Sequence, residues 1–472
     1  MTADCCRPEG SYDLAVIGAG SAGFSAAITA AEQGARVALI GHGTIGGTCV
    51  NVGCVPSKTM IRATETLHNG NAERFAGIRA RAELADWTAV VAQKDDLVET
   101  LRQSKYLDQL DNYPDVAYCE GQATFSPDHL LCNDAPVAAD KIIIATGSQN
   151  NVPDIPGLAG IPYLTSTTAF EMAELPRSIL LIGGGYIGCE VAQMLARAGV
   201  AVTIACRSRL LPEGEPEVSD ALRGYLRDEG LQVFDGLSYE SVTQSDTGIA
   251  LSVQMGSEPR ILAAERLLLC AGRLANTDGL NLATAGIDTV ANGGIAVDNR
   301  MHTSRPGIYA AGDVTGTDQF VYMAAYGARI AAQNALNGDS LTYDNHAMPA
   351  VVFTDPQVAT VGLTEAGAIL AGYDVATSLL PLEYVPRALA ARDTRGLIKL
   401  IADKTTKRLL GAHILAPEGA DSIQTAALAI RQGMTYIELG EMIFPYLTTV
   451  EGLKLAAQTF EKDVAKLSCC AG

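Results

Sequence analysis

The chain has 472 residues, enough for about three domains, and nearly half of them (48%) are apolar. Its formal net charge of −19 argues against nucleic acid or an anionic membrane as a partner. The first ten residues, MTADCCRPEG, lack the basic and apolar runs of a secretory signal, and no apolar run approaches the roughly 18 residues that span a bilayer. We therefore expect a cytoplasmic globular protein with no nucleic acid partner and no membrane insertion.

The first predicted element is an apolar strand that enters a glycine-rich turn, YDLAVIGAGSAG at residues 12–23, with an alanine-rich helix expected over 24–33. This strand–turn–helix order is the context of a dinucleotide fingerprint, in which the helix N-terminus faces the phosphates. Gly18 permits the tight turn, Gly20 lets the pyrophosphate approach the backbone, and Gly23 lets the helix pack on the strand. A chance glycine turn is the alternative interpretation. The next strand ends at Gly41 without the acidic residue that usually holds the adenosine ribose, so other groups must do so.

Two cysteines follow in GGTCVNVGCVPSK, residues 46–58. The spacing of Cys49 and Cys54 suits a disulfide across about one helical turn, and a helix N-terminus lowers a thiol pKa. Lys58 lies one turn after Cys54 and could stabilise a thiolate or an anionic flavin. The alternatives are a buried reduced pair or half of a zinc site, although zinc normally needs two further ligands.

Eleven cysteines in a cytoplasmic chain are not expected to form a disulfide framework. Besides Cys49 and Cys54, two adjacent pairs stand near the ends of the chain, Cys5–Cys6 and Cys469–Cys470. The other five lie in apolar surroundings and are predicted to be inert core residues: Cys119, Cys132, Cys189, Cys206 and Cys270.

A second fingerprint, SILLIGGGYIGCE, occupies residues 178–190, so the chain is expected to bind two dinucleotides. Its glycines are Gly183, Gly185 and Gly188. The strand after this helix ends without an acidic residue and continues into Arg207 and Arg209. Arginines there pair with the 2′-phosphate of NADP, whereas an acid would favour NAD. The alternative is a solvated basic pair.

A later segment, TSRPGIYAAGD at residues 303–313, is a strand that ends in Gly-Asp. Together with Ala145, Thr146 and Gly147 it looks like the second FAD signature of two-dinucleotide flavoproteins, in which Asp313 contacts the ribityl and phosphate region. The preceding Cys-Ala-Gly272-Arg resembles the segment that returns to the FAD domain. The predicted fold is α/β, with two Rossmann-like domains and an α+β C-terminal domain. The expected boundaries are FAD-binding 1–150, NADP-binding 151–269, FAD-binding 270–345 and C-terminal 346–472.

From about residue 12 onward, the cysteine segment, both fingerprints and residues 303–313 resemble the flavoprotein disulfide reductases, a pyridine nucleotide-disulfide oxidoreductase family. The resemblance implies that hydride passes from NADPH to FAD and then to the cysteine pair. It makes Cys54 the thiol beside the flavin and Cys49 the exchanging thiol. It places Thr48 at the FAD site, pairs Lys58 with Glu190 near the flavin, and adds Glu190 and Gly272 to the NADP site. It also implies a homodimer in which residues 346–472 complete the partner's active site.

One position departs from the members that reduce disulfides. They carry a His–Pro motif near the C-terminus, and the histidine protonates the departing thiol. Here the stretch reads FPYLTTVE at residues 444–451, with Tyr446 in place of the histidine and Glu451 retained. A phenol with a pKa of about 10 is a poor proton shuttle near neutrality. We therefore expect slow dithiol–disulfide exchange.

The C-terminal pair Cys469–Cys470 offers thiolates, which prefer soft cations such as Hg(II). Taken alone, the Cys469–Cys470 pair has two other interpretations: an incidental exposed thiol pair, or an electron-relay tail. With AVVFTDPQVA (350–359) and FPYLTTVEGLKLAAQTF (444–460), it resembles the branch of the family that reduces ionic mercury. That resemblance implies mercury detoxification, with Hg(II) as the substrate and metal ligands at Cys49, Cys54, Cys469 and Cys470.

The same resemblance places Tyr186 and Tyr446 at the inner metal site, although Tyr186 can equally pack over the nicotinamide pocket. Cys5–Cys6 is a candidate remnant of a capture site. Two competing functions remain. One is a dihydrolipoamide dehydrogenase, which needs a proton shuttle and normally uses NAD. The other is a flavoprotein that only sequesters soft metals.

Overall fold

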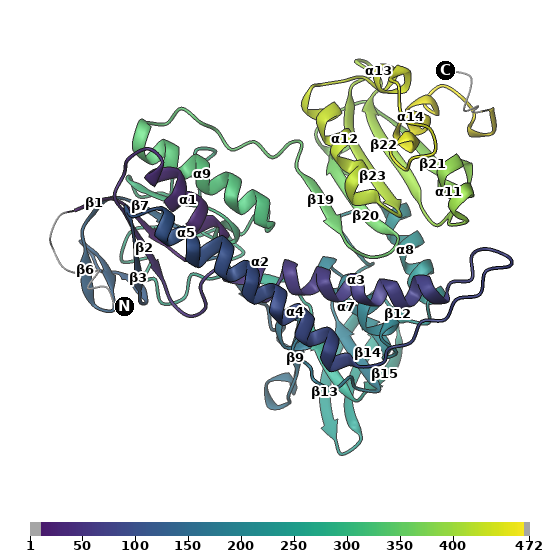
Figure 1. Ribbon diagram of the computed structural model, residues 1–472, viewed down its shortest axis with the longest axis horizontal. Helices are drawn as coiled ribbons and strands as arrows, with labels where there is room; N and C mark the ends of the chain where they lie inside the picture. Colours follow the sequence, from purple (N-terminus) through teal and green to yellow (C-terminus); the bar gives the residue numbers. More distant parts are fainter. Residues whose placement is uncertain (1–10, 467–472) are drawn as a thin grey trace. The chain divides into compact units, whose positions relative to one another are not determined.

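The structure, a computed structural model, describes residues 11–466 (Figure 1). The chain divides into two compact units, each assembled from three stretches. Unit 1 joins Met1–Thr59, Ala89–Asn151 and Gly272–Asp344, and unit 2 joins Met60–Thr88, Val152–Ala271 and Asn345–Gly472. Unit 2 holds both the second dinucleotide-binding sheet and the C-terminal sheet, so the four domain boundaries expected from the sequence stay a prediction.

Unit 1 is built on a five-stranded parallel sheet. Its strands are β1 (Tyr12–Ile17), β2 (Val37–Gly41), β3 (Val116–Glu120), β7 (Ala139–Ile144) and β18 (Ile308–Ala310). Their order is β18-β7-β1-β2-β3, with β1 in the centre between β2 and β7. A parallel sheet is covered on both faces, which explains the continuous apolar runs of β1 and β2.

Helices and a small meander form the covering layers of this sheet. The helices α1 (Ser21–Ala31) and α9 (Val321–Asn337) lie side by side on one face (Figure 1). A three-stranded meander packs on the other face: β4 (Ala123–Phe125), β5 (Leu130–Cys132) and β6 (Ala135–Val137). Helix α1 begins three residues before the predicted Phe24, because the glycine turn leads straight into the helix at its N-cap, Gly20.

The remaining elements include the helices that contain Cys49 and Cys54 and the short strands that link the two units along the chain. The helices are α2 (Gly47–Asn51), α3 (Cys54–Asn71), α4 (Trp87–Arg102), the π-helix η1 (Gln103–Leu107) and α5 (Asp108–Asn112). Two short strands, β8 (Ser148–Asn150) and β17 (Arg273–Ala275), pair antiparallel where the chain leaves and re-enters unit 1. The 3-10 helix η3 (Asp313–Thr315) follows β18.

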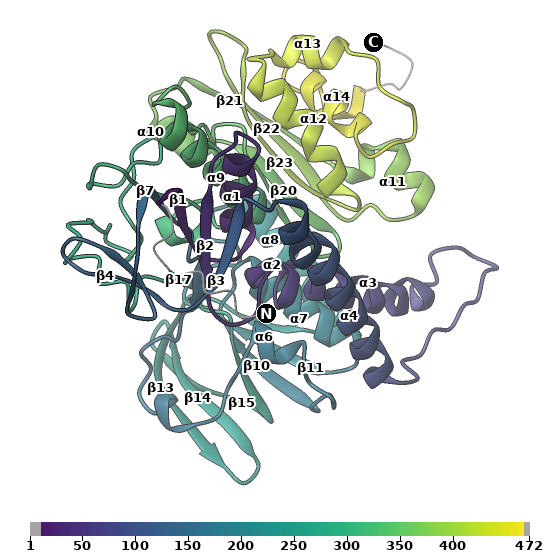
Figure 2. The same ribbon diagram turned by 60° about the vertical axis from the view of Figure 1, so that its left-hand side comes forward.

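Unit 2 contains a second parallel sheet of five strands, in the order β12-β11-β10-β16-β9. Their bounds are β9 (Leu164–Thr165), β10 (Ser178–Ile182), β11 (Ala201–Ala205), β12 (Gln232–Phe234) and β16 (Arg266–Leu269). The helices are η2 (Leu158–Gly160), α6 (Ser166–Ala169), α7 (Tyr186–Arg197) and α8 (Pro216–Asp228). A meander packs on the sheet (Figure 2): β13 (Leu237–Ser245), β14 (Gly248–Met255) and β15 (Glu258–Ala264).

The C-terminal part of unit 2 is an antiparallel sheet with helices. Its strands run in the order β19-β20-β23-β22-β21: β19 (Pro349–Val352), β20 (Gln357–Gly362), β21 (Val375–Pro381), β22 (Leu397–Asp403) and β23 (Leu409–Ala416). The helices are α10 (Glu365–Leu370), η4 (Leu382–Tyr384), α11 (Pro386–Ala391), α12 (Gly419–Arg431), α13 (Tyr436–Glu441), α14 (Glu451–Gln458) and η5 (Val464–Lys466). Helix α12 lies against β20 and β23 (Figure 1).

The predicted fold class is confirmed: two Rossmann-like sheets are combined with an α+β C-terminal domain. Within residues 11–466, no helix is both long enough and apolar enough to cross a bilayer.

Candidate active site

The two candidate redox cysteines lie at the junction of two helices in unit 1. Cys49 lies within the five-residue helix α2, and Cys54 is the first residue of α3. Gly46 (φ 99°) and Gly47 (φ 67°) bring the chain into α2 in a left-handed conformation that a side chain would strain. Both cysteines are half-buried, so the pair is partly accessible.

The loop between the cysteines is held by Asn51, whose role the sequence did not reveal. Its amide nitrogen donates to the carbonyl oxygens of Ile45 and Gly47, each at 2.9 Å. The guanidinium of Arg102, at the end of α4, donates to the Asn51 side-chain oxygen at 3.1 Å. These bonds fix the segment that separates the two sulfur atoms. No sequence pattern signals the pairing, because Arg102 and Asn51 are 51 positions apart.

The acidity of the Cys49 thiol depends mainly on its neighbour Cys54. The Cys49 pKa lies well above its usual range, first because Cys49 donates a hydrogen bond to Cys54, and further because of burial and the Cys54 charge. The charge of Lys58 opposes this rise. Cys49 therefore retains a proton that it shares with Cys54. The expected lowering of a thiol pKa by a helix N-terminus does not hold for Cys49, and the favourable position at the start of α3 belongs to Cys54.

Tyr106 is a second residue of this region that sequence reasoning missed. Its hydroxyl lies 3.1 Å from Ser21 Oγ, and its ring meets Phe24 edge-on at 4.9 Å between centroids. Burial raises its pKa, the Ser21 hydrogen bond lowers it, and charge on Cys49 and Cys54 raises it again. The net rise keeps this phenol protonated near the cysteine pair. Tyr106 belongs to the π-helix η1, an irregular element that is frequent at functional sites but has no clear sequence signature.

The first glycine fingerprint has the geometry that a bound dinucleotide requires. Gly18 has φ 117°, and a Cβ there would lie 2.2 Å from the Ala145 carbonyl oxygen. A Cβ on Gly23 would lie 1.7 Å from the Gly18 carbonyl oxygen, so only glycine allows the helix to approach the strand. At Gly20 the nearest atom to such a Cβ is the Cα of Gly47, at 3.5 Å. The backbone therefore leaves room for a phosphate group at the start of α1, so the fold fits FAD.

Asp313 lies in a polar cluster where β8, β17 and η3 meet. Ser148 Oγ donates to the Asp313 carboxylate at 2.6 Å, and Arg273 donates from Nε to Ser148 Oγ at 2.7 Å. Burial lowers the Arg273 pKa, while the charges of Asp313 and Cys54 raise it. The nearby Thr146 hydroxyl donates to the Asn276 carbonyl oxygen at 2.6 Å. Ser148 and Arg273 were not among the predicted site residues, since only the fold brings them together across 125 positions.

The second fingerprint, in unit 2, repeats this geometry. Gly183 has φ 121°, and a Cβ there would lie 2.1 Å from the Cys270 carbonyl oxygen. A Cβ on Gly188 would lie 2.3 Å from the Gly183 carbonyl oxygen. A Cβ on Gly185 would meet nothing within 4 Å, which leaves the N-terminus of α7 open to a phosphate.

The two arginines predicted to recognise the 2′-phosphate differ in their surroundings. The guanidinium of Arg209 donates to the carbonyl oxygens of Pro212, at 2.8 Å, and Gly214, at 2.5 Å. These two hydrogen bonds stabilise the loop between β11 and α8. Arg207, directly after Cys206, is exposed to solvent. Of the two side chains, Arg207 is the one available to an anion.

Helix α7 carries Tyr186 and Glu190. Burial and the charge of Glu213 raise the Tyr186 pKa, and a hydrogen bond with Thr360 lowers it. The Glu190 side chain is buried, and its Oε1 accepts a hydrogen bond from the Phe353 backbone nitrogen at 2.9 Å. Lys58 belongs to unit 1 and Glu190 to unit 2, so their pairing stays a prediction.

The segment with Tyr446 forms an exposed loop between α13 and α14. Its large apolar side chains are exposed: Met442, Ile443, Tyr446 and Leu447. Glu451 is buried and accepts a hydrogen bond from the Leu447 backbone nitrogen at 3.1 Å. Here the retained glutamate stabilises the loop backbone. The cysteines Cys5, Cys6, Cys469 and Cys470 lie outside the described residues.

The scattered cysteines agree with their predicted core role. Cys119, Cys132, Cys189 and Cys206 are buried, and Cys270 is half-buried. Burial raises the pKa of Cys206 to about 12, and that of Cys270 to about 12 as well. Thiols in this condition are unreactive near neutrality.

Between residues 11 and 466, one group of acidic, histidine or cysteine side chains could hold a metal: Glu215, Glu217 and Glu365. The ammonium of Lys399 already contacts all three carboxylates at 2.7–2.8 Å. Among residues 11–466, no third histidine, cysteine or carboxylate ligand is grouped with Cys49 and Cys54.

Comparison with known proteins identifies the family. Residues 12–332 match the pyridine nucleotide-disulphide oxidoreductase model, and residues 348–457 match the dimerisation domain of the same family. The mercuric reductase of Lysinibacillus sphaericus is 45% identical over 98% of this chain and 85% of its own length. The mercuric reductase of Streptomyces lividans is 46% identical over 98% of both chains.

Among solved structures, the Cu(II) complex of the HOCl-induced flavoprotein disulfide reductase RclA from Escherichia coli has a TM-score of 0.84. It is 32% identical and covers 95% of this chain and 99% of its own. These matches confirm the resemblance drawn from the cysteine segment and the two fingerprints, and they imply a flavin and a pyridine nucleotide as cofactors. The chain is an oxidoreductase of the pyridine nucleotide-disulphide oxidoreductase family.

Proposed function

We propose that this oxidoreductase uses NADPH to reduce Hg(II) to Hg(0) through FAD and the Cys49–Cys54 pair. The proposal rests on the combination of a cysteine pair with a missing histidine. In residues 444–451, Tyr446 occupies the position where disulfide exchange needs an imidazole. Several relatives at about 45% identity are named mercuric reductases, which supports the same substrate.

For FAD, we assign the turn glycines and the polar residues around them. The site comprises Gly18, Gly20, Gly23, Thr48, Lys58, Ala145, Thr146, Gly147 and Asp313. When bound, FAD converts a hydride equivalent into an electron pair that can pass to sulfur. The contact of Ser148 with Asp313 holds this carboxylate in one orientation.

For NADPH, the assigned residues are Gly183, Gly185, Gly188, Glu190, Arg207, Arg209 and Gly272. Arg207 is the direct ligand of the 2′-phosphate in this proposal, because it is exposed at the end of β11. Arg209 acts by shaping the loop through its bonds to Pro212 and Gly214. Tyr186 covers the nicotinamide at the start of α7.

At the sulfur pair, a soft cation replaces the proton held between Cys49 and Cys54. Thiolates prefer soft metal ions, so Hg(II) displaces this proton and lies between the two sulfur atoms. Two electrons reduce the ion to Hg(0), which has little affinity for thiolates and leaves. The overall reaction is NADPH + Hg(II) → NADP⁺ + H⁺ + Hg(0). Lys58 and Glu190 adjust the electrostatics of the site without binding the metal.

We further propose a homodimer in which the partner subunit completes each site. The family's dimerisation domain and the exposed apolar loop around Tyr446 support this arrangement. Tyr446 would then assist mercury transfer at the partner's cysteine pair. Cys469 and Cys470 would pass Hg(II) to that pair by ligand exchange. A reactive dithiol and NADPH both suit the reducing cytoplasm, where the reaction would serve mercury detoxification.

The test compares substrates under identical conditions. NADPH oxidation is followed with Hg(II) in excess thiol, with oxidised glutathione and with lipoamide. The proposal predicts rapid oxidation with Hg(II) and slow oxidation with both disulfides. Rapid NADPH oxidation with a disulfide, together with no NADPH oxidation in response to Hg(II), would instead identify a disulfide reductase.

A cysteine variant separates catalysis from metal storage. Cys54→Ala should abolish mercury-dependent NADPH oxidation while FAD remains bound, whereas Cys132→Ala, at a buried position in the β4–β6 meander, should retain turnover. Stoichiometric Hg(II) binding without NADPH consumption in the unmodified protein would contradict the enzymatic function.

A further inference from the structure

One face of α7 is bonded along its whole length to a single segment of the C-terminal domain. Tyr186, Glu190, Gln193 and Arg197 are spaced by four, three and four residues, so they share one side of the helix. All four contact residues 353–360, the stretch around the start of β20. Helix α7 is also the helix of the second dinucleotide fingerprint, and its N-terminus faces the proposed NADPH site.

The middle of this face binds the backbone of the segment. Glu190 Oε1 accepts from the Phe353 nitrogen at 2.9 Å. Gln193 makes two bonds to Asp355: its oxygen accepts from the backbone nitrogen at 2.8 Å, and its Nε2 donates to the carbonyl oxygen at 2.8 Å. The side chains of Glu190 and Gln193 are buried, with exposed fractions of 5% and 3%. A shift of the helix along or around its axis would leave these buried groups without partners.

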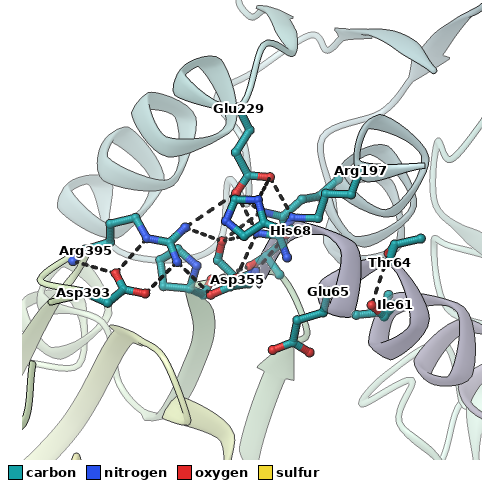
Figure 3. A network of polar contacts seen from close by, with 12 residues as sticks. Ile61, Thr64, Glu65, His68, Arg197, Glu229, Asp355, Asp393 and Arg395 are labelled. Atoms are coloured by element: carbon teal, nitrogen blue, oxygen red, sulfur yellow. Dashed lines mark hydrogen bonds and ion pairs between the residues drawn. The ribbon is translucent and has the colours of Figure 1, made fainter. Parts of the chain in front are cut away.

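The C-terminal end of α7 is held by charges (Figure 3). Arg197 donates to both carboxylate oxygens of Glu229, at 2.7 and 2.8 Å, and to the Asp355 carboxylate at 2.9 Å. Arg395 reaches the other Asp355 oxygen at 3.1 Å and the Asp393 carboxylate at 2.8 Å. Asp355 is therefore shared by two guanidinium groups, that of Arg197 at the end of α7 and that of Arg395 in the connection between α11 and β22.

The N-terminal end of α7 is held by Tyr186, which is hydrogen-bonded to Thr360 in β20. The same eight-residue segment, 353–360, thus holds the helix at its start, its middle and its end. The helix α3, which begins at Cys54, also reaches this network, with His68 Nδ1 3.9 Å from Glu229 Oε2 (Figure 3).

We propose that Gln193, Arg197 and Asp355 are positioning residues for hydride transfer, which act by fixing α7 and, through it, Tyr186 and the nucleotide-binding turn. None of the three is expected to touch the nucleotide. Arg197 lies eleven residues beyond Tyr186, roughly 16 Å along the helix axis. The proposal rests on NADPH as the reductant, a part of the proposed function, but it does not depend on the identity of the final electron acceptor.

The test measures the first half-reaction alone. Anaerobic enzyme is mixed rapidly with NADPH, and flavin reduction is followed by absorbance without mercury. The variants Arg197→Lys and Asp355→Asn keep the approximate size of each side chain but remove the bidentate geometry or the shared charge. We expect flavin reduction to slow at least tenfold at saturating NADPH, while the Kd of NADPH changes less than threefold. The bound flavin content should equal that of the parent protein.

A matched control uses Arg223→Lys. Arg223 also bridges two carboxylates, Asp220 and Asp235, within the nucleotide-binding sheet and its helices. It makes no such bond to residues 353–360, so its variant should reduce flavin within twofold of the parent rate. A uniform slowing in all three variants would show general loosening and overturn the positioning role.

The double variant Arg197→Lys, Asp355→Asn gives a second criterion. Because both changes break the shared Arg197–Asp355 contact, the loss of rate in the double variant should be smaller than the product of the two single losses. Multiplicative losses, or single variants within twofold of the parent rate, would also overturn the proposal. If the parent protein is reduced rapidly by NADPH but does not consume Hg(II), the proposed function fails while this inference stands.

Discussion

The ammonium of Lys399 lies 2.7 Å from Glu215, and both side chains are almost completely buried, with exposed fractions of 3% and 2%. Two further carboxylates contact the same nitrogen, Glu217 at 2.8 Å and Glu365 at 2.7 Å. Burial lowers the Lys399 pKa, but the three hydrogen-bonded carboxylates outweigh burial and raise it overall. This contact joins the start of α8 to β22 and α10, so one cation stabilises the packing of three elements.

Lys399→Met should destabilise the protein by about 3–5 kcal/mol, because it leaves a buried carboxylate without its cation. The free energy of unfolding, measured by chemical denaturation, gives this difference. The matched change Lys404→Met removes an exposed ion pair with Asp374 and should cost less than about 1 kcal/mol. Equal, small losses in both variants would show that the buried cluster does not depend on its lysine.

His413 should make stability fall in mild acid. Its ring is buried beside Glu215, and burial lowers its pKa below the ordinary value of about 6.5. The unfolded chain therefore binds a proton at His413 at a higher pH than the folded protein does. The stability from the neutral ring is present above about pH 6.5 and is lost as pH falls toward the lowered pKa.

The measurement for His413 is the free energy of unfolding against pH. His413→Gln should show a shallower decline below about pH 6.5 than the parent protein. His129→Gln, at an exposed position, serves as the control and should follow the parent curve. A parent curve that is flat through this range, or one that His413→Gln does not alter, contradicts the prediction.

Arg207 should determine the preference for NADPH. Arg207→Ala removes a charge-assisted hydrogen bond worth about 1.5–3 kcal/mol, so KM for NADPH should rise by about 10- to 100-fold with KM for NADH unchanged. Steady-state kinetics with both nucleotides measures the effect. Arg209→Ala should instead weaken the binding of both nucleotides to the same extent, because the Arg209 guanidinium bonds to the loop backbone. If Arg209→Ala alone selectively raised the KM for NADPH, Arg209 would be the ligand of the 2′-phosphate.

Tyr446→His should increase the reduction of disulfides. An imidazole at this exposed position can protonate a departing thiol, and general acid catalysis contributes about 10²–10⁴-fold. We expect a gain at the lower end of this range, because Glu451 is engaged with the Leu447 backbone and is not free to orient the ring. Lipoamide-dependent NADPH oxidation measures the gain, with Tyr446→Phe as the control. No gain over Tyr446→Phe would mean that the missing imidazole does not limit disulfide exchange.

The sequence predicted those features that depend on neighbouring residues. Gly18 and Gly183 were recognisable because the turn, the strand and the helix around each occur within a dozen residues. Cys49 and Cys54 were recognisable because the short segment around them is distinctive. The fold class followed from two such fingerprints and the C-terminal motifs.

Contacts between distant residues were not predictable from a single sequence. Asn51 with Arg102, Ser148 with Arg273, and Gln193 with Asp355 are separated by 51, 125 and 162 positions. Each uses residue types that are common on protein surfaces, so composition gives no sign of the partner. The same reason explains why the sequence does not distinguish Arg209 from Arg207. Its backbone acceptors in the following loop become visible only once that loop is folded.

The amount of Hg(0) released for each NADPH consumed tests directly whether this protein reduces Hg(II) through its cysteine pair. The full chain is incubated with limiting NADPH, Hg(II) and excess thiol under a gas stream, and the trapped Hg(0) is compared with the NADPH consumed. We expect one Hg(0) for each NADPH, and none from Cys49→Ala or Cys54→Ala. NADPH consumption without volatile mercury, or full release from the Cys54→Ala protein, would contradict this expectation.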